Sequence, residues 1–130
     1  MTKDDAVVVA RILEAVGRRV SFRYPGDEKH KSGHLIDRAV VRSNPGARGV
    51  PYWDVVDLIE FKGEKNPEWI RIGYYRKPKS RLQWGSQTTI TEPVKTWKRV
   101  LVKAANQKPW FHALLVGVVG QLRVSRRSKR

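Results

Sequence analysis

The N-terminal segment has the pattern of a helix that covers a core. Residues 6–16 are rich in apolar side chains at helical intervals, and Thr2 precedes them as a candidate cap. Asp4 and Asp5 suit the positive end of a helix. Gly17 is typical of a residue that ends one. We therefore expect a helix that follows Thr2 and stops at Gly17.

Alternating apolar and polar residues predict strands in the middle of the chain. The alternation is clearest over 69–76. Pro25, Gly26 and Asp27 are turn residues, so a hairpin is expected to join the first two strands. The predicted strands are 20–24, 35–42, 52–62, 69–76 and 82–90.

Segment 52–62 allows two interpretations. Asp54, Asp57 and Glu60 recur at intervals of three and would line one side of a helix. The β-branched and aromatic content of the segment favours a strand instead. In a strand, the residues that share one face are Trp53, Val55, Ile59 and Phe61.

Two helices are predicted after the strands. Thr91, Glu92 and Pro93 resemble a helix opening, with a hydroxyl cap, an acid in the first turn and a proline whose missing N–H does no harm. Residues 106–109 interrupt this helix, and a second apolar-striped helix begins at Trp110. The apolar positions of the first helix are Val94, Trp97, Leu101, Ala104 and Ala105.

The order of these elements predicts the fold class. One helix, about five strands and two helices are typical of an α+β protein, with an antiparallel or mixed sheet covered by helices. The chain has 130 residues, which is enough for one core. We expect a single domain over 1–124, followed by a disordered basic tail over 125–130.

The charge of the chain indicates which class of partner it binds. Lys and Arg number 27 against 12 Asp and Glu, which gives a net charge of +15. Residues 1–65 hold 12 basic and 10 acidic side chains, whereas residues 66–130 hold 15 basic side chains and only Glu68 and Glu92. A one-signed field of this kind favours a polyanionic partner. The alternative is a solvated surface with no specific ligand.

Composition also excludes several classes of protein. The chain has no Cys, so disulfide scaffolds, thiolate zinc sites and Cys nucleophiles are ruled out. The longest apolar window, 114–122, is about half of what a bilayer span needs. The acidic N-terminal residues do not resemble a signal peptide. We expect a cytoplasmic protein without a membrane span.

The strand 69–76 is the main candidate for a nucleic-acid-binding face. Its period of two places Ile70, Ile72 and Tyr74 on one side, expected to be core, and rings and cations on the other. Gly73 would let a partner approach. Trp84 and Trp97 are expected to be core residues, whereas Trp69 and Tyr75 suit a core and a stacking role equally well. The candidate binding residues are Trp69, Arg71, Tyr75, Arg76, Lys77, Lys79, Arg81, Lys95, Lys98, Arg99, Lys103, Arg126 and Arg127.

An alternative hypothesis is a metal-dependent nuclease. Asp37 on one predicted strand and Glu60 with Lys62 on the next are groups that can hold a divalent metal and orient water against a phosphodiester. In these residues the chain resembles the PD-(D/E)xK nucleases, over about residues 3–63. The resemblance implies a helix followed by three strands, Asp37 and Glu60 as ligands of Mg²⁺, and Lys62 as a catalytic residue. It departs from the family pattern because Ile36, not Pro, precedes Asp37.

Other chemistry has little support in the sequence. His30 and His34 lie four residues apart, but in a predicted cationic loop rather than on a helix, which argues against zinc. No cofactor is indicated, apart from Mg²⁺ under the nuclease hypothesis. A third hypothesis is an interaction protein whose basic helices and Trp110 dock on an acidic protein or an anionic membrane surface. The choice between DNA and RNA stays open.

Overall fold

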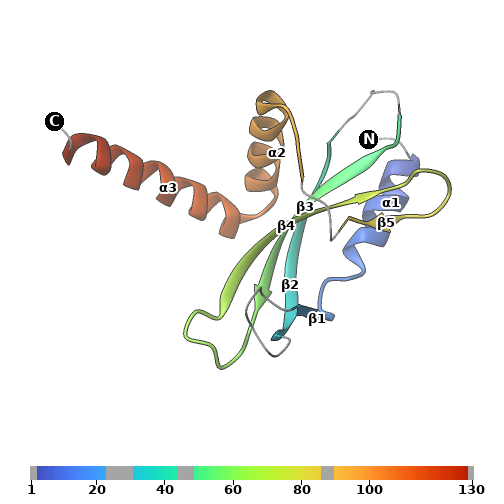
Figure 1. The fold of residues 1–130 in the computed structure, drawn as a ribbon, viewed down its shortest axis with the longest axis horizontal. Helices are drawn as coiled ribbons and strands as arrows, with labels where there is room; N and C mark the ends of the chain where they lie inside the picture. Colours follow the sequence, from blue (N-terminus) through green and yellow to red (C-terminus); the bar gives the residue numbers. More distant parts are fainter. Residues whose placement is uncertain (1–2, 23–30, 44–48, 86–89, 129–130) are drawn as a thin grey trace. The chain divides into compact units, whose positions relative to one another are not determined.

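A computed structural model describes residues 3–22, 31–43, 49–85 and 90–128. In these ranges the chain forms one helix, five strands and two helices, which confirms the α+β fold (Figure 1). The strands form one sheet in the order β1-β2-β3-β4-β5, and every neighbouring pair is antiparallel. The elements are α1 Lys3–Leu13, β1 Arg19–Phe22, β2 Lys31–Arg42, β3 Tyr52–Glu60, β4 Glu68–Arg76, β5 Gln83–Trp84, α2 Val94–Gln107 and α3 Pro109–Ser128.

Contacts between residues group the chain into two compact units. The first unit, 1–91, holds α1 and the sheet, and the second unit, 92–130, holds α2 and α3. The single domain expected over 1–124 stays a prediction. No helix among the described residues is long and apolar enough to cross a membrane.

The core of the first unit lies between α1 and one face of the sheet (Figure 1). Val8 and Ile12 of α1 pack with Trp53 and Val55 of β3 in one buried cluster. A second cluster contains Leu35, Ile59 and Phe61. The predicted common face of Trp53, Val55, Ile59 and Phe61 is therefore buried, and segment 52–60 is a strand rather than a helix.

Element ends differ from the predictions where a turn depends on distant partners. α1 ends at Leu13, and the chain then turns through Gly17, whose φ of 89° suits glycine and whose N–H donates to the Leu35 carbonyl. β3 stops at Glu60, before Gly63 with a φ of 85°. Of the predicted strand 82–90, Gln83–Trp84 is a strand, and residues 86–89 lie outside the described residues. The Thr2 cap and the turn at 25–27 lie outside the described residues.

The second unit starts later and extends further as helix than expected. Pro93 is the N-cap of α2 and makes no side-chain cap hydrogen bond, so the prediction of a Thr91 cap is wrong. Lys108 is extended, which breaks the helix, and Pro109 begins α3, where a missing N–H costs nothing. Residues 125–128 of the predicted tail belong to α3, and 129–130 lie outside the described residues.

Candidate nucleic-acid interface

The side of β4 that contacts the two core clusters is not the side that the sequence predicts. Trp69 and Tyr75 pack against the two clusters of the core, whereas Ile70 and Ile72 are 39% and 40% exposed. The register explains this, because Trp69 lies opposite Ile59 of β3 and Tyr75 lies opposite Trp53, both of which are buried. Ile70 and Ile72 are therefore more exposed than expected for core residues, although Tyr74 on the same face is half-buried and Val56, opposite Ile72, is buried.

Both candidate stacking rings make contacts within the fold. The Tyr75 hydroxyl accepts a hydrogen bond of 2.8 Å from Arg38 Nη1, and its ring centroid lies 4.8 Å from that of Trp84. The Trp69 indole N–H donates to the Asn66 carbonyl at 2.7 Å, and its ring meets Phe61 edge-on at 5.4 Å. Each ring is half-buried. These contacts fix the rings, so stacking on bases would have to use the remaining exposed parts.

Beside Tyr75, two arginines share one buried carboxylate. Arg38 Nε and Nη2 donate to the two oxygens of Asp57 at 2.7 and 3.0 Å, and Arg71 donates twice to Asp57 Oδ2 at 3.1 and 2.9 Å. Arg38 also donates to the Ile12 carbonyl at 3.0 Å, which ties α1 to the sheet. Arg38 and Asp57 are 2% and 0% exposed. The predicted binding residue Arg71 therefore binds a carboxylate inside the protein, although the single charge of Asp57 balances only one of the two guanidinium groups.

Sequence reasoning missed Arg38, although a signal for it exists. Asp57 lies two residues after Val55 and two before Ile59. In a strand these residues share one face, so the carboxylate of Asp57 is expected on the buried side. A buried carboxylate requires a cation or several donors. Arg38 lies directly opposite Asp57 in the register of β2 and β3 and supplies them.

Two opposing effects act on the pKa of Arg38. Burial alone lowers the pKa of the guanidinium, but the hydrogen bonds and negative charge of Asp57, with a contribution from Tyr75, raise it above its ordinary value. A raised pKa means that the stabilisation is present at neutral pH and is lost only as the pH rises through the folded-state value. Arg38 therefore stays charged throughout the physiological range.

Gly73 allows a close approach, but by a side chain of this protein. A Cβ placed on Gly73 would lie 2.2 Å from Trp84 Cη2. The Arg71 guanidinium lies 5.1 Å from the centre of the Trp84 ring and that of Arg38 lies 5.7 Å away. Trp84 packs against the core as predicted, and it occupies the space that was expected to receive a partner.

The loop between β4 and β5 presents cations of a different kind. We call Arg76, Lys77, Lys79 and Arg81 the cationic turn. Lys77 is half-buried and its backbone N–H donates to the Pro51 carbonyl at 3.0 Å, while the other three residues are exposed. Over the part of the chain that the structure describes, none of the four forms an ion pair. Residues 69–91 contain no Asp or Glu at all, so the charge of this turn is not offset locally.

The remaining predicted cations belong to the second unit. Lys95, Lys98 and Lys103 are exposed on α2, and Arg99 is half-buried there. Arg126 and Arg127 are exposed in the last turn of α3. The second unit has ten basic residues and one acid, Glu92. Each unit thus has its own cationic surface.

The residues of the nuclease hypothesis are only partly brought together. Asp37 lies opposite Leu58 and His34 lies opposite Glu60, so Asp37 and Glu60 share one face of neighbouring strands. Lys62 is not on that strand, because β3 ends at Glu60 and Lys62 lies in the following turn. The backbone N–H of Arg38 donates to Asp37 Oδ1 at 2.9 Å.

Metal ligands do not cluster in the described ranges. No group of three His, Cys, Asp or Glu residues there has the geometry to hold a metal ion. His34 is exposed and belongs to strand β2, not to the loop expected for it, and His30 lies outside the described residues.

Comparisons with protein-family models, with curated proteins and with solved structures gave no match to this chain. The geometry of its own residues therefore has to carry any functional conclusion.

Proposed function

We propose that this protein binds nucleic acid and that the cationic turn of the first unit contacts the phosphates. The observation that carries the proposal is that residues 69–91 contain no Asp or Glu, while exposed cations lie at the end of β4 and in the loop that joins it to β5. Phosphate contacts need cations that no carboxylate of the protein already neutralises, and the turn supplies them. Arg71 is excluded from the proposed contacts because Asp57 binds it.

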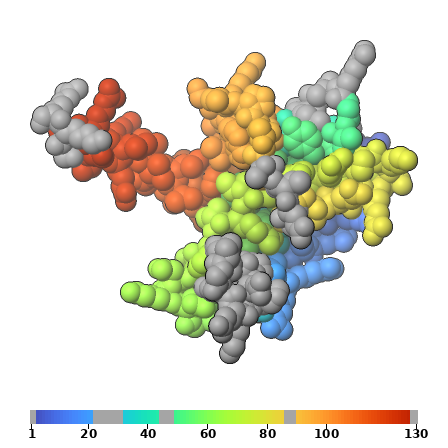
Figure 2. All heavy atoms as spheres, viewed as in Figure 1, coloured from blue at the N-terminus to red at the C-terminus, as the bar shows by residue number. Residues whose placement is uncertain are grey.

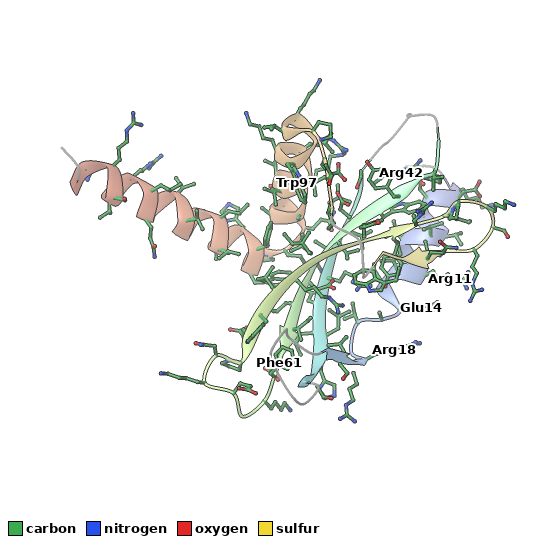
Figure 3. All side chains as sticks on the ribbon, viewed as in Figure 1. Arg11, Glu14, Arg18, Arg42, Phe61 and Trp97 are labelled. Carbon is green, nitrogen blue, oxygen red and sulfur yellow. The ribbon has the colours of Figure 1, made fainter. Side chains whose placement is uncertain are left out.

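The surface around α1 provides a matched contrast. Lys3, Arg11, Arg18 and Arg19 are also exposed. Asp4, Asp5 and Glu14 occur in the same stretch of chain, so its net charge is close to zero. Figure 3 shows Arg11, Glu14 and Arg18 along α1 and the turn after it. A surface with a net charge close to zero attracts a polyanion only weakly.

The test is a salt series of binding to fluorescent single-stranded DNA, double-stranded DNA and RNA, with EDTA present. The test variant replaces the four residues of the cationic turn with Gln. The control variant replaces Lys3, Arg11, Arg18 and Arg19 with Gln and so removes the same charge. Each lost phosphate contact should lower the slope of log affinity against log salt by about 0.9 for duplex DNA and about 0.7 for single strands.

We expect the test variant to lose about three units of slope on its preferred probe and the control variant to lose less than about one. Equal changes in the two variants would contradict a specific role of the cationic turn. Weak binding of the unmodified protein to all three probes at moderate salt would contradict nucleic-acid binding itself.

The same mixtures with Mg²⁺ or Mn²⁺ test the nuclease hypothesis. Shortened probes on a gel, present only with the metal and absent in Glu60→Ala and Lys62→Ala, would make Asp37, Glu60 and Lys62 catalytic candidates. Cleavage that survives both substitutions would remove them from consideration.

A further inference from the structure

An open groove lies between the two helices of the second unit. Its volume is about 550 Å³, and its walls include Val102 and Ala105 of α2 and Leu115, Val116 and Val119 of α3. Val102 and Val116 are each 57% exposed and Val119 is 47% exposed. In Figure 2 the atoms of α2 (orange) and α3 (red) diverge from their junction and leave a notch that opens outward. The groove is therefore mainly apolar and accessible.

Cations continue the groove along α3. The residues of α3 that line it follow helical spacing, from Leu115 and Val116 through Val119 to Arg123. Arg126 and Arg127 come three and four residues after Arg123, so they lie on the same side of the helix. One side of α3 thus has an apolar half followed by a cationic half.

The charge and the apolar walls of the groove limit which kind of molecule can bind in it. A second copy would bring another unit with ten cations and one acid against the first, and like charges repel. Nucleic acid would find mostly aliphatic walls here, since Asn106, His112 and Arg123 are the polar residues among the nine that line the groove. A bilayer would instead take up Leu114, Val118 and Leu122, which are 44%, 47% and 63% exposed on the side of α3 away from Arg123, and this would leave the groove uncovered.

We infer that the groove binds an acidic amphipathic helix of a partner protein. The apolar positions of such a helix, at i, i+3 or i+4 and i+7, would pack on Leu115, Val116 and Val119. Acidic residues about two turns further along would pair with Arg123, Arg126 and Arg127. The inference is independent of the nucleic-acid proposal, because the cationic turn belongs to the other unit.

The probe for the test is a designed, fluorescein-labelled helical peptide of about five turns, with leucines on one stripe and glutamates at one end and on the outer face. A scrambled peptide of the same composition has no stripe. Fluorescence anisotropy with the full chain measures the affinity. The groove variant is Val116→Ser with Val119→Ser. The control is Val118→Ser with Val124→Ser on the same helix, whose side chains are 47% and 65% exposed but do not line the groove.

We expect the groove variant and Arg126→Gln with Arg127→Gln to weaken peptide binding by about tenfold or more, and the control to change it less than about twofold. Circular dichroism shows whether each variant keeps its helices. The variant of the cationic turn should bind the peptide normally, which separates this inference from the nucleic-acid proposal.

Several results would overturn the inference. One is that the unmodified protein does not bind the designed peptide, and another is that it binds the scrambled peptide equally well. Equal loss in the groove and control variants would show that the groove is not the binding site. Sedimentation equilibrium tests whether a second copy occupies the groove, and binding to phosphatidylserine vesicles tests whether a membrane does. If the unmodified protein does not bind the peptide but self-associates, and the groove variant does not, the groove binds a second copy of this chain. If it binds vesicles instead, and the groove variant does not, the groove binds a membrane.

Discussion

Two groups of cations in the first unit differ in whether they bind a carboxylate of the protein. Inside the sheet and at its α1 side, Arg38 and Arg71 share Asp57, and Arg42 forms an ion pair with Asp5. In the cationic turn, no ion pair forms within the described parts of the chain. Net charge alone would count both regions equally as binding surface.

The difference teaches that a cation's neighbours decide its role. A guanidinium that is buried with a carboxylate stabilises the fold only while the partner is present, and removing the partner is strongly destabilising. An exposed cation with no carboxylate nearby contributes little to folding and remains available to a ligand. The paired region should therefore respond to substitution through stability, and the cationic turn through binding.

The largest effect is expected from Asp57→Asn. The substitution leaves Arg38 buried without its counter-charge and removes the partner of Arg71 as well, so the free energy of unfolding should fall by about 3–5 kcal/mol. Urea unfolding followed by circular dichroism measures it. Asp4→Asn, at an exposed position in the first turn of α1, is the control and should cost at most about 1 kcal/mol. Similar losses in the two variants would contradict a structural role of the paired region.

A second prediction concerns how tightly the paired region is covered by Trp84. Gly73→Ala should destabilise the protein by about 1–3 kcal/mol, because the new methyl group would collide with the indole ring. In a Trp84→Leu background the added cost of Gly73→Ala should fall close to zero, a coupling that a double-mutant cycle detects. Gly117→Ala in α3, where a Cβ meets open space, should not destabilise. Full additivity of Gly73→Ala and Trp84→Leu would refute the contact.

The fold was predictable where the signal is local. The apolar periodicity of α1, the alternation of β4 and a break between the two C-terminal helices each depend on neighbours in the sequence. All three are confirmed, although the break lies at Lys108 and not over the whole of 106–109. Element ends were not predictable to the same degree. Residues 31–34 belong to β2 because β1 pairs with them, and the turn at Gly17 uses the Leu35 carbonyl as acceptor. Such partners are distant in the sequence.

The prediction of which side of β4 contacts the core clusters failed for a similar reason. A period of two defines two faces but does not say which one the rest of the chain covers. Ile70 and Ile72 are the more apolar pair, whereas the buried side carries Arg71, and only the carboxylate of Asp57 makes that placement acceptable. The cationic turn, in contrast, was predictable as an exposed basic loop from composition alone. Its role in binding stays a prediction.

A third prediction asks to which region Arg71 belongs. Its side chain is 30% exposed, so solvent screens part of its interaction with Asp57. Arg71→Gln should lower the free energy of unfolding by about 1 kcal/mol and leave the salt slope of nucleic-acid binding unchanged. Urea unfolding and the salt series measure the two quantities. A lower slope with unchanged stability would move Arg71 from the paired region to the binding surface.

The smallest effect on stability is expected from the cationic turn itself. Replacement of Arg76, Lys77, Lys79 and Arg81 by Gln removes no ion pair with a described residue, and three of the four side chains are exposed. The free energy of unfolding should therefore change by no more than about 0.5 kcal/mol, while the affinity for nucleic acid falls. The two readouts must be measured on the same variant, because binding lost together with stability would point to unfolding. Lost stability with intact binding would reverse the assignment, since the turn would then serve the fold and the phosphate contacts would have to come from other cations.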